Sequence, residues 1–119
     1  MVQNRNKLLD LFVGNLSNAA LHRILEQSAE DEELRQYYGK EVLNSMGIAK
    51  NYREKINPVG AAFPEDDGEN VRRKVIERVK NKLKIRILEG YENVKLDAVD
   101  KVVDELLLET KVISRSSQP

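Results

Sequence analysis

The sequence contains no cysteine and no tryptophan, and its one histidine is His22. Without cysteine the chain has no disulfide framework and no thiolate that would serve as nucleophile or metal ligand. His22 has Glu26 one helical turn away, but it lacks the second group of ligands that a zinc site needs. It also lacks the oriented nucleophile and base of a covalent catalyst. We therefore predict no catalytic residue, no metal site and no cofactor, and we do not expect an enzyme.

Long apolar runs are absent as well. No stretch approaches the roughly 20 apolar residues that cross a bilayer. Lys7 and Asp10 interrupt the first apolar stretch, where a signal peptide would be unbroken. The sequence thus predicts a cytoplasmic protein that does not enter a membrane. The 20 basic residues are balanced by 20 acidic ones, which argues against a histone-like binder of nucleic acid.

Glycine and proline are scarce, with 6 and 3 residues, and apolar residues recur at helical spacing through most of the chain. This spacing predicts about five helices, over residues 5–13, 17–27, 28–56, 71–88 and 96–110. Gly14 weakens the first helix, so the second begins at Ser17 or continues the first with a kink. Apolar and polar residues alternate over 82–88, so a short β-hairpin over 82–96 is the alternative there. We predict an all-α bundle.

The segment 57–70 separates the predicted helices into two groups. It contains two prolines, two glycines and four acids, which is typical of a long loop. A chain of 119 residues falls within the usual size of one domain. We therefore expect a single helical domain over 1–113, with a three-helix half (1–56) and a two-helix half (71–113). The last residues, 114–119, are predicted to be a disordered tail.

Charge is distributed unevenly toward the carboxyl end. Residues 71–88 contain eight basic residues and one acid, a net charge of +7, whereas residues 89–110 contain two bases and seven acids, a net charge of −5. Five cations spread over the helix face opposite the valines: Arg73, Lys74, Arg78, Lys80 and Lys84. We expect this face to form ion pairs with Asp97, Asp100 and Asp104, within one chain or between two copies.

Two alternatives to this pairing remain open. An uncovered cationic helix neutralises the phosphates of a nucleic acid, with strong salt dependence and little sequence preference. No aromatic residue lies within 71–86 to stack on bases, however. In the second alternative, the same cationic face is simply exposed to solvent and binds no partner. A DNA-reading helix in the amino-terminal half is disfavoured, because the acids of residues 30–33 would repel phosphates.

Apolar side chains project from more sides of the last two predicted helices than a single neighbouring helix can bury. The residues that lie off the inner stripes are Ile85, Leu88, Leu108, Val112 and Ile113, and grouped apolar residues of this kind mark contact surfaces. The predicted function is a non-enzymatic helical interaction or scaffold protein that self-associates as a homodimer through its carboxyl-terminal helices. A further protein partner would meet the acidic loop or the amino-terminal half. The alternative is a small nucleic-acid-binding protein that uses the basic helix 71–86.

Overall fold

The computed structural model describes residues 5–56, 63, 65–91 and 94–113. Four α-helices follow one another in this part of the chain, α1 (Arg5–Ser28), α2 (Glu32–Ile56), α3 (Glu65–Leu88) and α4 (Val99–Glu109), and a short 3-10 turn, η1 (Leu96–Ala98), precedes α4. The predicted all-α class is confirmed, with four helices in place of about five. None of the helices described combines the length and the apolar character that a membrane span requires.

The first two predicted helices form a single helix, α1, which runs through Gly14 without a break. A glycine inside a helix costs only about 1 kcal/mol relative to alanine, and the burial of apolar side chains on both sides of it outweighs that cost. Ser17, which we expected to start a new helix, is buried. Its hydroxyl donates to the carbonyl oxygen of Val13 at 2.7 Å, so it is satisfied inside the helix.

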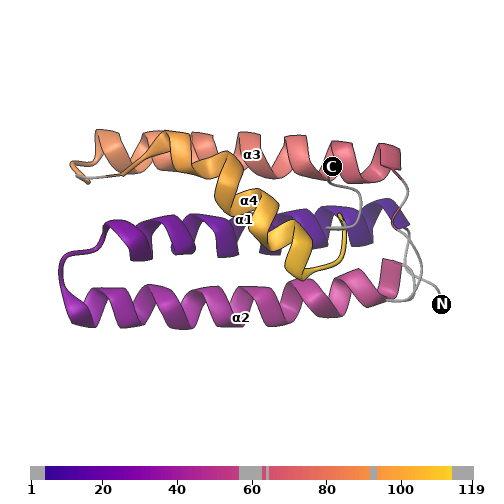
Figure 1. Cartoon of the computed structure of the whole chain (residues 1–119), viewed down its shortest axis with the longest axis horizontal. Coiled ribbons are helices and arrows are strands. Elements are labelled where there is room, and N and C mark those ends of the chain that lie inside the picture. Colours follow the sequence, from indigo (N-terminus) through magenta and orange to yellow (C-terminus); the bar gives the residue numbers. More distant parts are fainter. Residues whose placement is uncertain (1–4, 57–62, 64, 92–93, 114–119) are drawn as a thin grey trace.

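Helix α1 lies at the centre of the bundle. Antiparallel α2 packs on one side of it, α3 lies on the other side, and α4 crosses it obliquely (Figure 1). The buried residues of α1 point in several directions: Leu8, Phe12, Val13, Leu16, Ser17, Ala19, Ala20, Leu21, Ile24 and Leu25. A helix that is apolar around much of its circumference belongs in an interior, because it has several faces to bury.

The other helices turn one stripe each toward α1. In α3 the buried seam is Val71, Val75, Val79 and Leu83, and in α4 it is Val99, Val102, Val103, Leu106 and Leu107. Both stripes follow the helical spacing of the apolar residues, and Leu96, just before α4, lies in η1 and is half-buried. One apolar core includes residues from all four helices.

Helix α3 begins earlier than predicted, at Glu65, so residues 65–70 of the expected loop are helical. Acids at a helix start are favoured by the helix dipole, and Asp67 also pairs with Arg5 of α1. Gly68 is buried in this first part of α3, against Val112. The rest of the expected loop, apart from Phe63, lies outside the described residues, as does the expected tail.

The β-hairpin alternative over 82–96 is wrong for the described residues 82–91 and 94–96, because α3 continues to Leu88. A helix keeps Leu83 in line with the valine seam, which a strand would not. Gly90 ends the helix as predicted, in the left-handed region at φ 101°. Its N–H donates to the carbonyl of Ile87, and the N–H of Tyr91 donates to that of Arg86, both at 3.1 Å, which is a Schellman motif.

Helix α4 ends in the same way, but with a lysine at the left-handed position. Lys111 has φ 61°. Its N–H donates to the carbonyl of Leu108 at 3.1 Å, and the N–H of Val112 donates to that of Leu107 at 2.9 Å. This turn brings Val112 back to the start of α3, where a Cβ placed at Gly68 would lie 3.7 Å from a methyl group of Val112.

Candidate functional site

Two of the three acids expected to meet the basic helix do so. The guanidinium of Arg72 donates to both carboxylate oxygens of Asp104, at 2.7 and 3.2 Å. The ammonium of Lys80 lies 3.7 Å from the carboxylate of Asp100. Asp97 is exposed in η1 and forms no ion pair with the residues the structure describes. The hydrogen bond to Asp104 raises the pKa of Arg72 above its ordinary value.

These pairs orient α4 more than they hold it. The side chains of Arg72 and Asp104 are 41% and 40% exposed. Solvent-exposed ion pairs contribute about 0–1 kcal/mol each. Burying one Val or Leu side chain contributes about 1.5–3 kcal/mol, so the apolar stripe of α4 supplies most of its attachment. The charges select the register in which the two helices meet.

Other cations of α3 turn toward α1. Arg78 lies beside Gly14, where an added Cβ would be 3.5 Å from a guanidinium nitrogen. The ammonium of Lys82 donates to the side-chain oxygen of Asn18 at 3.1 Å. The aliphatic stems of such side chains cover apolar surface while the charged ends reach water. These residues therefore belong to the border between α1 and α3.

The five cations predicted as one face consequently point in three directions. Lys80 pairs with α4 and Arg78 lies against α1. Arg73, Lys74 and Lys84 are exposed and form no ion pair with any described residue; Arg73 donates only to the side chain of Asn70, at 3.2 Å. The solvent-facing remainder of the cationic face is thus these three residues.

The residues predicted for self-association are also separated. Ile85 and Leu88 are exposed at the carboxyl end of α3, and Leu88 is 87% exposed. Val112 is 7% exposed, Ile113 packs against the core, and Leu108 is half-buried. Val112 contacts the start of α3 near Gly68, about 30 Å along the helix from Leu88 at 1.5 Å per residue. The five residues do not form one surface of a single chain.

The carboxyl end of α3 and the α1–α2 turn lie at the same end of the bundle (Figure 1), and several exposed apolar side chains belong to these two segments. We call this group the end surface; it consists of Leu34, Tyr37, Ile85, Leu88 and Tyr91, all at least 39% exposed. Ile85 and Leu88 were predicted from the sequence. Leu34, Tyr37 and Tyr91 were missed.

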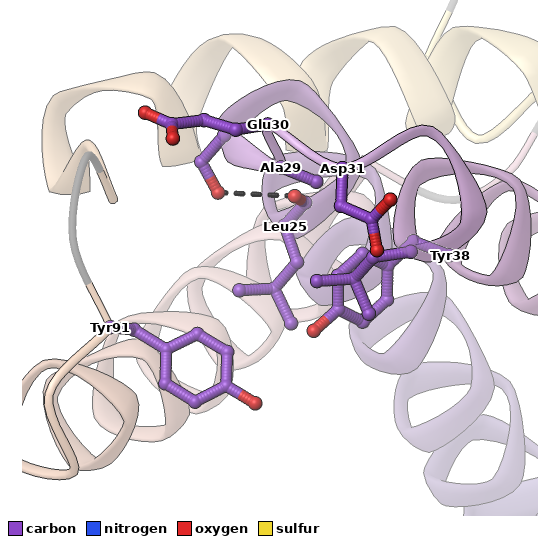
Figure 2. Close-up of a pocket in the computed structure, with 8 residues that line it drawn as sticks. Leu25, Ala29, Glu30, Asp31, Tyr38 and Tyr91 are labelled. Atoms are coloured by element: carbon purple, nitrogen blue, oxygen red, sulfur yellow. Dashed lines mark hydrogen bonds between the residues drawn. The ribbon is translucent and has the colours of Figure 1, made fainter.

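A pocket of about 280 Å³ lies in the part of this surface next to the α1–α2 turn. Figure 2 shows Tyr91 and Tyr38 on opposite sides of Leu25, with Glu30 and Asp31 along the rim. Asp31 also caps α2, since its carboxylate accepts a hydrogen bond from the N–H of Glu33 at 3.2 Å. The pocket therefore combines an apolar floor, two phenol rings and two carboxylates.

Tyr38 is buried in the pocket wall, and its ring lies next to other aromatic rings. Burial raises the pKa of Tyr38 to about 12, and the nearby hydroxyl of Tyr91 acts in the same direction. The ring of His22 lies 5.9 Å from that of Tyr38, and its Nδ1–H donates to the carbonyl of Asn18 at 2.7 Å. The single histidine thus supports the pocket wall.

Two local signals in the sequence point to the residues that were missed. Tyr37 and Tyr38 are adjacent on a helix, so only one of them can face α1, and Tyr38 does. Tyr91 follows Gly90 directly, and the turn at that glycine brings its ring over the guanidinium of Arg86, 5.5 Å from the ring centre. Leu34 gave no such signal, because it lies on the same stripe as Tyr38.

No group of three or more histidine or acidic side chains in the described part of the chain is arranged to hold a metal ion. No family model, no curated protein and no solved structure matches this chain.

Proposed function

We propose that this chain is a non-enzymatic interaction protein of the cytoplasm that self-associates through the end surface. The observation that supports this most strongly is the exposure of Leu88, 87%, beside other exposed apolar and aromatic side chains. Scattered apolar residues on a surface are ordinary, but a group of them drawn from two separate segments marks a contact surface. Burying one leucine contributes about 1.5–3 kcal/mol, which favours covering it.

A second copy is the partner that this proposal favours. Most homo-oligomers are two-fold dimers in which the same surface on both subunits meets itself. In this proposal the contact includes Ile85 and Leu88 of α3, Leu34 and Tyr37 of α2, and Tyr91. Aromatic residues are enriched at the centres of protein interfaces, which fits the three tyrosines at and beside this end of the bundle.

Sedimentation velocity over a range of concentrations tests the proposal. The wild-type chain is expected to shift from monomer to dimer as concentration rises. Leu88→Ser removes an exposed apolar side chain from the end surface and should keep the chain monomeric. Leu43→Ser is the matched control, because Leu43 is 74% exposed on α2 and lies outside the end surface. If both variants dimerise like the wild type, the end surface is not the contact.

Nucleic-acid binding is the second candidate function. Arg73, Lys74 and Lys84 are exposed without an acidic partner among the described residues, and free cations of this kind contact phosphates. Glu77 lies on the same face and is also exposed, which weakens the case. A gel-shift titration with duplex DNA and structured RNA at two salt concentrations tests it. The candidate is eliminated if neither probe is retarded at low salt, and Arg73→Gln with Lys74→Gln should weaken any binding that is seen.

A further inference from the structure

The pocket at the α1–α2 turn contains a buried hydroxyl that the helices around it leave unsatisfied. Tyr38 is only 6% exposed, and its hydroxyl makes no hydrogen bond of ordinary geometry with any residue that the structure describes. Figure 2 shows the hydroxyls of Tyr38 and Tyr91 directed toward each other, into the space between the two rings. A buried polar group without a partner is costly in free energy, so a ligand that supplies the missing hydrogen bond is favoured there.

Two further polar groups of the pocket are acceptors of hydrogen bonds. Ser28 and Asp31 both line it. The hydroxyl of Ser28 donates to the carbonyl of Leu25 at 3.0 Å, so its oxygen remains as an acceptor. One carboxylate oxygen of Asp31 accepts the N–H of Glu33 at 3.2 Å, and the second accepts no hydrogen bond from a described residue. A ligand that satisfies these groups therefore brings N–H donors.

Two arginines at the edges show that the walls of this pocket attract positive charge. The guanidinium of Arg35 donates to the carbonyl of Ala29 at 2.8 Å, just beyond the carboxyl end of α1. The guanidinium of Arg86 lies over the ring of Tyr91, 5.5 Å from its centre. The carbonyls at the end of a helix and the faces of aromatic rings both favour cations. The ring of Tyr38 is a second face of this kind in the pocket wall.

The charge of Asp31, in contrast, is not balanced within the described part of the chain. Arg35 pairs with Glu32 at 3.3 Å, and Arg86 pairs with Glu89 at 3.3 Å. Asp31 forms no ion pair with a described basic residue. Each of the two arginines is therefore paired with a carboxylate of its own, and Asp31 is left as a negative group for a cationic ligand.

The floor and the volume of the pocket define the rest of the ligand. Leu25 and Leu34 line it, so an aliphatic chain has an apolar surface to cover. Its volume of about 280 Å³ is just below the range of roughly 300–1,000 Å³ that is usual for pockets holding small molecules. A short alkyl chain with one cationic end fits these dimensions.

We propose that this pocket binds the ammonium end of a short aliphatic amine. The ammonium lies between the carboxylate of Asp31 and the phenol hydroxyls, and the alkyl chain lies on Leu25 and Leu34. This site is independent of the self-association proposed above, because Leu88 does not line it. A free amine and the side chain of a lysine bring the same groups to the pocket, and the experiment below separates them.

An amide NMR titration with n-butylammonium tests the proposal. Shifts are expected at residues 25, 28–31, 34, 38 and 91, with a dissociation constant on the order of 1 mM, which is about what a ligand of this size supplies. n-Butanol and butyrate are the matched probes, since they lack the ammonium group, and each should bind about tenfold more weakly or worse. The titration is repeated on Leu88→Ser, so that a change of oligomeric state does not contribute to the shifts.

Two pairs of variants assign the polar contacts. Asp31→Asn keeps the cap of α2 and removes the charge, so it should weaken the binding of n-butylammonium about tenfold, whereas Asp97→Asn makes the same change on an exposed acid of η1. Tyr38→Phe keeps the ring and removes the hydroxyl, and it should weaken binding about threefold or more. Tyr37→Phe is its control, because Tyr37 does not line the pocket.

The outcomes are distinct. If n-butanol binds as well as n-butylammonium, or if Asp97→Asn weakens binding as much as Asp31→Asn, the assignment of a cation is overturned. If no pocket residue shifts at amine concentrations well above the expected dissociation constant, the site itself is overturned, whatever the oligomeric state. Lysine blocked at both ends is the second amine. Tighter binding than n-butylammonium identifies a peptide lysine as the ligand, weaker binding identifies a free amine, and both results support the proposal.

Discussion

The two ends of α3 differ in what covers them. Over the first part of the helix, α4 lies alongside, Arg72 and Lys80 pair with its acids, and Val112 packs on Gly68. At the carboxyl end, Ile85 and Leu88 are exposed. The buried seam facing α1 nevertheless continues to Leu83. One helix therefore has an inner side that is buried along most of its length and an outer side that is covered only near its start.

Helix lengths account for this difference. Helix α3 has 24 residues and α4 has 11, which correspond to about 36 and 16 Å. Because α4 is less than half as long, it leaves one end of α3 without a cover. The ion pairs at Arg72 and Lys80 place α4 over the amino-terminal part. The carboxyl end of α3 is thus left uncovered because of the position at which α4 packs along α3. This is the end that carries the exposed Ile85 and Leu88.

The largest expected contrast is between two leucines of α3. Leu83 is fully buried, so Leu83→Ala should lower the free energy of unfolding by about 2–5 kcal/mol. Leu88→Ala should change it by no more than about 0.5 kcal/mol, as exposed substitutions usually do. Urea unfolding of the dilute chain, followed by circular dichroism, measures both. A loss at Leu88 as large as that at Leu83 would mean that the end of α3 is covered within the monomer.

The next contrast is between the ends of α3 and α4, which are terminated by the left-handed residues Gly90 and Lys111. An alanine in that region is strained by roughly 1–2 kcal/mol, so Gly90→Ala should destabilise the chain by about 1 kcal/mol. No heavy atom lies within 4 Å of the added Cβ, so the loss reports backbone strain and not a clash. Lys111→Gly should stabilise the chain by about 1 kcal/mol, because it relieves the strain at φ 61°. Thermal unfolding of both variants checks the opposite signs.

The smallest contrast concerns charge. A double-mutant cycle with Arg72→Gln and Asp104→Asn should give a coupling of up to about 1 kcal/mol that weakens as salt is added. Arg73→Gln removes a neighbouring cation that has no acidic partner among the described residues, and it should change stability by only a few tenths of a kcal/mol. Equal effects at the two arginines would show that the pair with Asp104 does not form in solution.

The sequence was sufficient for the features that depend on periodicity. Val75, Val79 and Leu83 recur every four residues, and the buried seam of α3 follows from that spacing alone. Gly90 was a sufficient stop signal, because a glycine at the end of an apolar stripe readily adopts the left-handed conformation. Of the two alternatives at Gly14, the separate helix from Ser17 was wrong, since a local cost of about 1 kcal/mol does not compete with burial on several sides.

The residues of the candidate site could not be predicted from the spacing of apolar residues, because tertiary contacts determine which of them are exposed. Val112 was predicted to be part of a contact between copies, yet the left-handed Lys111 turns the chain so that Val112 is buried at the start of α3. A lysine at such a position gives no signal in the sequence. Leu34 lies on the inner stripe of α2 but is 39% exposed, because it stands at the pocket where the α1–α2 turn meets Tyr91. Only the tertiary arrangement brings these residues together.

A dilution series followed by amide NMR tests the central claim most directly, because it locates the contact without any substitution. The account predicts that concentration-dependent shifts are confined to residues 30–38 and 84–91, with none around Leu43 and Ile48, which are also exposed apolar residues on α2. Shifts centred on Leu43 and Ile48, or the absence of any shift up to millimolar concentration, would contradict it.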